Sequence, residues 1–129
     1  MSSYRKATLD EMAAEQWPHW IPVRHFFGID AFGVNAYRAK DGADAVPEHD
    51  ETASGHVELY FVASGRARFT IDGETFEAPA GTFIYLEEPA ATRSAQAAVD
   101  DTVVVAVGGP RGQAYEVLGW DTQYLEGES

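Results

Sequence analysis

The chain contains no cysteine, and it has only nine Lys and Arg residues against 21 Asp and Glu residues, a formal net charge of −12. Without cysteine, neither a disulfide framework nor a thiolate zinc site can form, which fits a reducing compartment. The shortage of basic residues argues against nucleic acid and against anionic membranes, because phosphate contacts need clustered Lys and Arg. A small-molecule partner is therefore expected.

Long apolar runs are also missing. No run approaches the roughly 18 residues needed to cross a bilayer. Residues 1–16 lack the apolar central region of a secretory signal. The expected location is the cytoplasm. The length of 129 residues fits a single domain built on one core.

The first 30 residues are predicted to form a short helix followed by an aromatic arm. Thr8 and Glu11 have the spacing of a capping box, and Pro18 would end the helix. Residues 17–29 are expected to be extended, with three aromatic side chains covering a face of a sheet. These side chains are Trp17, Trp20 and Phe26.

Residues 31–109 read as a series of short strands separated by turns. The Asp72-Gly73 pair between two strand-forming segments is the strongest hairpin signal. Many short strands with almost no helix predict an all-β barrel or sandwich. The stretch at 108–112, Gly-Gly-Pro-Arg-Gly, is interpreted as a turn rather than a phosphate site. Residues 110–129 are expected to form an irregular segment that packs back onto the barrel.

Two spaced patterns occupy residues 42–86. The first is Gly42, six residues, His49-Asp50-Glu51, then Glu58 and, six residues later, Gly65; the second is Gly73, five residues, Pro79-Ala80-Gly81, two residues, then Ile84. Together they resemble the two motifs of the cupin family, in which glycine and proline fix the turns. The resemblance implies a small cupin-type jelly-roll β-barrel.

The resemblance also implies a metal site of three histidines and one glutamate facing the barrel interior. His49 and Glu58 match two of these ligands, Glu51 stands for the second histidine, and Ile84 replaces the third. Because both motifs depart from the pattern, we expect no complete metal site and no cofactor. The alternative is one divalent metal (Fe, Mn or Zn) held by His49, Glu51 and Glu58, with His56 as a substitute ligand.

Alternation along a strand puts His56, Glu58 and Tyr60 on one face, which the cupin frame turns inward. Without a metal, His56 and Glu58 are expected to hydrogen-bond each other or a ligand, and they are the candidate acid and base if the protein is catalytic. The expected ligand pocket adds Ile84 as an apolar wall, and also Tyr37 and Arg93. Arg93 would neutralise Glu58, bind an anionic ligand or lie on the surface. The alternation leaves open which face of residues 32–39 points inward.

The expected function is binding of a small organic molecule in the barrel. The alternative is a metal-dependent cupin enzyme of the dioxygenase, isomerase or cyclase type, since a fold does not specify a function. The identity of the ligand and the presence of catalysis stay open at this point. A homodimer is expected, with the arm at 17–29 covering a partner's sheet and so protecting an exposed edge.

Overall fold

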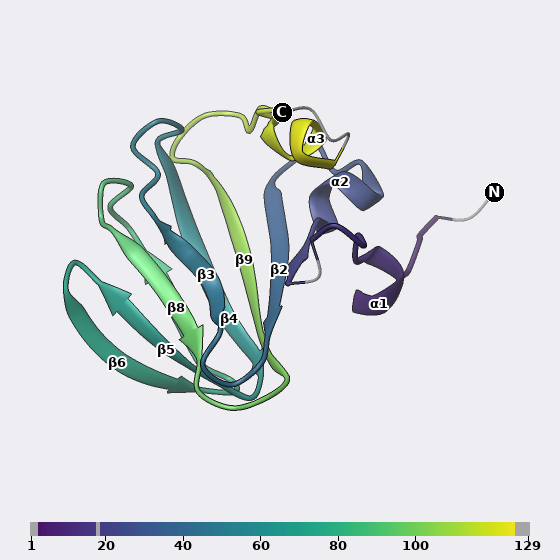
Figure 1. Ribbon diagram of the computed structural model, residues 1–129. Helices are drawn as coiled ribbons and strands as arrows, with labels where there is room; N and C mark the ends of the chain where they lie inside the picture. Colours follow the sequence, from purple (N-terminus) through teal and green to yellow (C-terminus); the bar gives the residue numbers. More distant parts are fainter. Residues whose placement is uncertain (1–2, 18, 126–129) are drawn as a thin grey trace.

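Two antiparallel β-sheets face each other in the computed structural model, which describes residues 3–17 and 19–125 (Figure 1). One sheet has five strands in the order β1 (Trp20–Ile21), β2 (Gly33–Ala39), β9 (Thr102–Pro110), β4 (His56–Ser64) and β7 (Phe83–Leu86). The other has four, in the order β3 (Asp44–His49), β8 (Arg93–Ala97), β5 (Arg66–Ile71) and β6 (Glu74–Pro79). The prediction of an all-β jelly roll is confirmed.

The core lies between the two sheets, where the inward side chains of both meet. Tyr60, Val62 and Val104 come from the five-stranded sheet, and Val46 and Phe69 come from the four-stranded one. All five are at most 1% exposed. Full burial of one such side chain stabilises the fold by about 1.5–3 kcal/mol. The core therefore holds the two sheets together and fixes the positions of the strands that carry the site.

The glycine pattern of the sequence corresponds to real turns. Asp72 and Gly73 both have positive φ, 48° and 84°, as a two-residue hairpin between β5 and β6 requires. Gly65 also has positive φ, and a Cβ there would lie 2.5 Å from Thr102 Oγ1. No other residue fits at position 65 without moving Thr102. The hairpin prediction is therefore confirmed in its backbone geometry.

The N-terminal arm differs from its prediction. Helix α1 (Leu9–Met12) begins with the expected capping box between Thr8 and Glu11, but it ends after one turn. Pro18, predicted to end it, lies outside the described residues. The arm is not simply extended either, because it contains β1 and helix α2 (Val23–Phe27).

The arm covers its own chain. Met12 and Ile21 form a second apolar cluster with Ala36 of β2. In the register of β1 against β2, Ile21 pairs with Ala36 and Trp20 pairs with Tyr37. Ala36 therefore faces outward under the arm, while Tyr37 packs against the barrel core. The inward face of residues 32–39, left open by the sequence, is the one that carries Asn35 and Tyr37.

The C-terminal segment is irregular only up to residue 119, after which it forms helix α3 (Trp120–Leu125). An ion pair between Arg24 Nε and Asp121 Oδ2, 2.8 Å apart, joins α3 to α2, and both side chains are less than 10% exposed. The helix thus closes over one end of the barrel (Figure 1). Within the described ranges, every helix is too short to count as a membrane-spanning segment.

Candidate functional site

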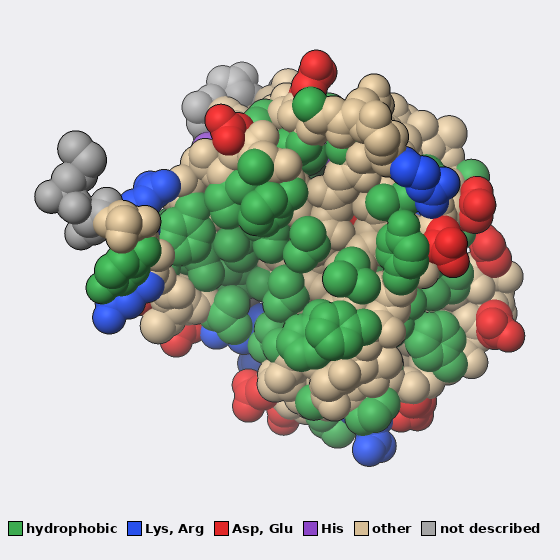
Figure 2. All heavy atoms as spheres, turned by 180° about the vertical axis from the view of Figure 1, so that it is seen from behind, with side chains coloured by type: hydrophobic (Ala, Val, Ile, Leu, Met, Phe, Trp, Pro, Cys, Tyr) green, Lys and Arg blue, Asp and Glu red, His purple; other side chains and the backbone are tan. Residues whose placement is uncertain are grey.

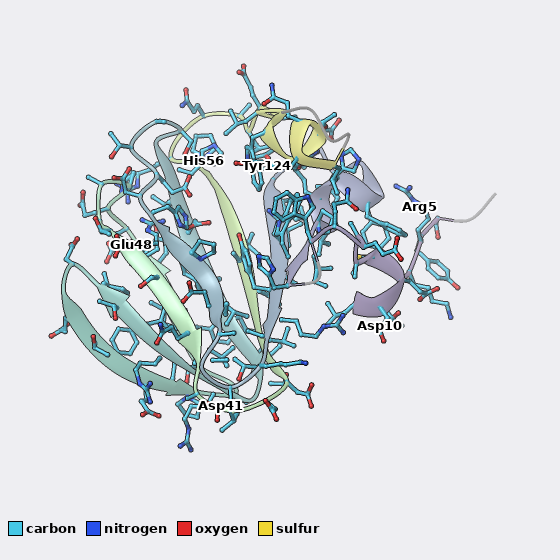
Figure 3. The ribbon with its side chains drawn as sticks, in the orientation of Figure 1. Arg5, Asp10, Asp41, Glu48, His56 and Tyr124 are labelled. Carbon is cyan, nitrogen blue, oxygen red and sulfur yellow. The ribbon has the colours of Figure 1, made fainter. Side chains whose placement is uncertain are left out.

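A cavity of about 550 Å³ opens at the end of the barrel beneath α3. Figure 3 shows His56 and Tyr124 at this end, and Asp41 at the other. One side of the cavity, here called the acid–base wall, consists of His49, Glu51 and Glu58. A second part of the lining, here called the aromatic wall, comes from the two ends of the chain: Trp17, Trp20, Trp120 and Tyr124.

A β-bulge in β3 positions His49. Val46 pairs with Ala95 and His49 pairs with Arg93, so β3 advances three residues while β8 advances two. One extra residue on one strand bends that strand and re-aims the side chains beyond it. The bulge includes Pro47, which cannot donate to the ladder but whose carbonyl accepts a hydrogen bond from His49 Nδ1 at 2.8 Å. His49 therefore has a fixed orientation at the cavity.

His49 and Glu51 form an acid–imidazole pair, with 2.9 Å between Nε2 and Oε2. Because Nδ1 donates to the Pro47 carbonyl, a single proton lies between Nε2 and Oε2. The hydrogen bond to Glu51 raises the pKa of His49. Burial raises the pKa of Glu51, but hydrogen bonds from His49 and Ser54 oppose burial, and the net pKa is lowered. Both directions favour the ion pair of an imidazolium and a carboxylate over the neutral pair.

Two buried hydrogen-bond donors fix the carboxylate of Glu58. Its Oε1 accepts from Tyr60 Oη at 2.6 Å and from Arg93 Nη1 at 2.7 Å. The Arg93 side chain has no exposed surface, and its Nε donates to the carbonyl of Ala91. Burial has the largest effect on Glu58 and raises its pKa, the Tyr60 hydrogen bond lowers it, Glu51 raises it and Arg93 lowers it, and the net pKa is raised. The guanidinium therefore supplies the cation that a buried carboxylate needs.

The residues do not complete a metal centre. Three donors converge, since ligand atoms of His49, Glu51 and Glu58 lie within 4.8 Å of one another. The fourth position is Ile84, which pairs with Tyr60 across β4 and β7 and packs on the core. Glu58 Oε1 already accepts two hydrogen bonds, and a fixed positive charge lies 2.7 Å from it. A divalent ion here would be repelled by Arg93 and would compete with the proton on His49.

The predicted pocket residues divide into two groups. Tyr37, His56 and Glu58 line the cavity, as do His49 and Glu51, whereas Tyr60, Ile84 and Arg93 lie outside its lining. Tyr60 and Arg93 each contact the lining through a hydrogen bond to Glu58.

The expected pairing of His56 with Glu58 is not what the described residues show. The ring of His56 lies against Tyr115, 5.6 Å between centroids, and Glu58 bonds Tyr60 and Arg93 instead. Tyr60 has the same two-residue spacing from Glu58 on the other side, and its hydroxyl reaches Glu58 Oε1 at 2.6 Å. The acid–imidazole pair of the site is His49 with Glu51.

Two features of the site were not predicted from the sequence. They are the aromatic wall and the role of the glycines Gly33 and Gly108. Gly108 and Gly109 are not in a turn, because β9 continues to Pro110. A Cβ on Gly108 would lie 3.2 Å from Glu58 Cγ, and one on Gly33 would lie 3.3 Å from Tyr115 Oη. These glycines make room for Glu58 and Tyr115. Two adjacent glycines inside a strand pattern were the available signal, since they indicate a close approach.

No family model and no curated protein matches this chain. Solved structures do. A cupin protein from Bacteroides fragilis aligns with a TM-score of 0.69 at 23% identity, over 88% of this chain and 89% of that one. A protein from Photorhabdus luminescens aligns with a TM-score of 0.66 at 18% identity, over 86% and 90%. A predicted oxalate decarboxylase from Thermotoga maritima aligns with a TM-score of 0.54 at 17% identity, over 66% and 71%. The chain therefore has the cupin fold.

Proposed function

We propose that this protein binds a small organic molecule in the cavity at the barrel mouth, and that it does so without a metal. The observation that carries the proposal is the fully buried Arg93, whose Nη1 lies 2.7 Å from Glu58 Oε1. A fixed guanidinium neutralises the carboxylate that in a metal-binding barrel would face an ion. His49 likewise neutralises Glu51 at 2.9 Å. The acid–base wall is thus balanced by the protein's own groups.

The size and lining of the cavity support the proposal. Ligand sites typically enclose about 300–1,000 Å³, with mostly apolar walls and a few placed polar groups. The cavity of about 550 Å³ falls in this range and combines six large aromatic residues with polar ones. Such a lining suits a molecule with an apolar body and one polar end.

Thermal-shift screening with a metabolite library tests the proposal. A bound ligand raises the free energy of unfolding by about 2.7 kcal/mol at 100 times its Kd, which moves the midpoint upward. The shift should shrink in Trp120→Ala, which opens the aromatic wall. It should persist in Tyr4→Ala, which removes an exposed aromatic ring outside the cavity lining. Absence of any shift, or equal shifts in both variants, would count against the proposal.

A second candidate function is a metal-dependent cupin enzyme. It is favoured by the three converging donors and by the hydrogen bond from His49 Nδ1 to a backbone carbonyl, an orientation common among metal-binding histidines. The alignment with a predicted oxalate decarboxylase is in keeping with it. Titration of chelator-treated protein with Mn²⁺, Fe²⁺ and Zn²⁺ separates the two candidates. Tight binding that is lost in Glu58→Gln would favour the enzyme.

We also propose that a second copy of the chain covers the outer face of β9, β4 and β7. Here the cross-strand pairs form one apolar array of Leu59, Phe61, Phe83, Tyr85 and Val107. Phe83 is 63% exposed and Tyr85 is 52% exposed. Figure 2 views the molecule from behind, where hydrophobic side chains gather across the surface. A chain of net charge −12 repels its own copy, so self-association needs an uncharged face such as this one.

The molar mass in solution tests the dimer. Light scattering after size exclusion should give twice the chain mass of 14.1 kDa. Phe83→Lys should give the single-chain mass, because it places a charge in the array. Phe26→Lys, at an exposed aromatic on the arm, is the matched control and should leave the dimer intact. A wild-type protein of single-chain mass would contradict the proposal.

A further inference from the structure

The last part of the described chain, residues 111–125, has no backbone hydrogen bond to the barrel. Strand β9 pairs with β4 as far as Pro110. Beyond it, and among the described residues, no backbone–backbone hydrogen bond joins residues 111–125 to the rest of the protein. We call this stretch the C-terminal cap, because it lies across one end of the barrel and includes α3 (Figure 1).

The C-terminal cap also buries little of its own surface. Asp121 is its one buried residue. The large apolar side chains of Leu118, Trp120 and Tyr124 are between 42% and 53% exposed. A region with few buried contacts and no backbone hydrogen bonds to its surroundings opens at a lower cost in free energy than the whole domain unfolds. The cap meets both conditions, whereas the strands beneath it meet neither.

Two side chains make the main contacts between the cap and the rest of the protein. Asp121 pairs with Arg24 of α2 at 2.8 Å, and both side chains are less than 10% exposed. Tyr115 lies against His56, and a Cβ on Gly33 would come within 3.3 Å of its hydroxyl. The cap's other hydrogen bonds, of 2.9–3.4 Å, involve Gln16, Trp17, His25 and Glu87. Because a buried pair is costly to break, the ion pair with Arg24 is the main barrier to opening.

The cap supplies a large part of the cavity lining. Its lining residues are Tyr115, Leu118, Gly119, Trp120, Asp121 and Tyr124. The barrel side of the lining includes Ala106 of β9, which is 5% exposed. The chain leaves β9 near Gly112, which has a positive φ of 73°, and no atom lies within 4 Å of the place that a Cβ would take. The turn at Gly112 is therefore free of packed side chains.

We propose that the C-terminal cap is a gate to the cavity. It opens at Gly112 as a unit while the barrel stays folded, and the ion pair between Arg24 and Asp121 holds it closed. Opening separates the cap's part of the lining from the barrel's part and admits the ligand. The proposal rests on the proposed function for what enters the cavity, but the movement itself needs no ligand.

Labelling of one introduced thiol tests the gate. The chain contains no cysteine, so Ala106→Cys carries a single thiol on the barrel side of the cavity. Its rate of reaction with fluorescein maleimide is measured in urea below the unfolding transition. The rate should depend only weakly on urea, because the urea dependence of an opening scales with the surface that it exposes. Val62→Cys, fully buried and outside the cavity lining, is the matched control. It should react at least about tenfold more slowly and with a steep urea dependence, since global unfolding is needed to expose it.

Two outcomes of the labelling would overturn the gate. Equal rates and equal urea dependences for the two thiols would mean that the cavity is reached only by global unfolding. A rate for Ala106→Cys equal to that of the urea-unfolded chain would mean that the cavity is always open. Either result would leave small-molecule binding to be decided by the metabolite screen, and a negative screen would not alter the labelling result.

Three further changes, each made in the Ala106→Cys protein, test the role of the ion pair. Asp121→Ala should raise the labelling rate at least about tenfold, because it breaks a buried pair. Asp10→Ala breaks an exposed pair with Arg38 and should change the rate by less than about twofold. Val46→Ala weakens the core outside the cavity lining and should leave the rate unchanged, because the closed and open states lose the same contacts. No rise in Asp121→Ala, or an equal rise in Val46→Ala, would overturn the assignment.

Discussion

The two walls of the cavity are built in different ways. The acid–base wall comes from β3, the loop after it and β4, and its side chains are fixed by hydrogen bonds of 2.6–2.9 Å. The aromatic wall comes from residues 17–20 and 120–124, about a hundred positions apart, and is held by ring contacts of 5.4–6.4 Å and by one ion pair. The first wall is part of the folded barrel, whereas the second is added by the chain ends.

This difference separates stability from specificity. Changes in the acid–base wall should act mainly on folding, because they leave buried charges without partners. Changes in the aromatic wall should act mainly on the ligand, because Trp120 and Tyr124 are 42% and 53% exposed and contribute less to the core. One wall can therefore vary while the other is retained.

The largest expected effect is on stability, in the acid–base wall. Arg93→Met leaves Glu58 buried without its cation and should lower the free energy of unfolding by about 3–5 kcal/mol, measured by urea denaturation. The double variant with Glu58→Gln should recover part of this loss, because it removes the uncompensated charge. A loss below about 1 kcal/mol would mean that the pair is not buried as described.

A smaller effect is expected where the aromatic wall is attached. Asp121→Ala breaks the buried pair with Arg24 and should lower the free energy of unfolding by about 2 kcal/mol, less than the loss at Arg93 because α3 is short, with Trp120 and Tyr124 about half exposed, and can relax. Affinity for any cavity ligand should fall as well. Asp10→Ala is the control, since it breaks an exposed pair with Arg38 at the same distance, 2.8 Å. That variant should change stability by less than about 0.5 kcal/mol, and equal losses would contradict the comparison.

The smallest expected effect is a pH dependence from His49 and Glu51. The pKa of His49 is raised above its ordinary 6.5, so its contribution is present below pH 6.5 and is lost as pH rises through the folded-state pKa. The pKa of Glu51 is lowered below its ordinary 4.5, so its contribution is present above pH 4.5 and is lost as pH falls. The pair should thus stabilise the fold most between these two values.

Urea denaturation at about pH 5.5 and about pH 8.5 tests whether the free energy of unfolding falls as the pH rises through the pKa of His49. Glu58 also contributes a decline with rising pH, because its pKa is raised. In His49→Gln, the fall in the free energy of unfolding that is due to Glu58 should therefore remain. The fall that begins above pH 6.5, the ordinary pKa of His49, should disappear. An unchanged slope in the variant would show that His49 is not the group that titrates.

The barrel could be predicted because its signals are local. The Asp72-Gly73 hairpin and the turn at Gly65 follow from short patterns, and both appear in the structure. The position of His49 could not be predicted, since it depends on a bulge in β3 against β8. The sequence left open whether Arg93 would neutralise Glu58, bind an anionic ligand or lie on the surface. The register of β8 decides this, because it sets whether Arg93 points inward.

The aromatic wall was beyond sequence reasoning for a different reason. Trp17 and Trp20 fit equally well as a cover for a sheet, and nothing local joins them to Trp120 or Tyr124. The contact depends on the buried pair of Arg24 with Asp121, which are 97 residues apart. Long-range packing of this kind is set by the whole fold rather than by a pattern in one segment.

The most direct test of the account is the metal content of protein purified without chelator. We expect well below one transition-metal ion per chain, because Arg93 and a protonated His49 supply the charges that balance Glu58 and Glu51. Elemental analysis of the wild type and of Glu58→Gln should give the same low value. A stoichiometric metal in the wild type that disappears in Glu58→Gln would contradict it.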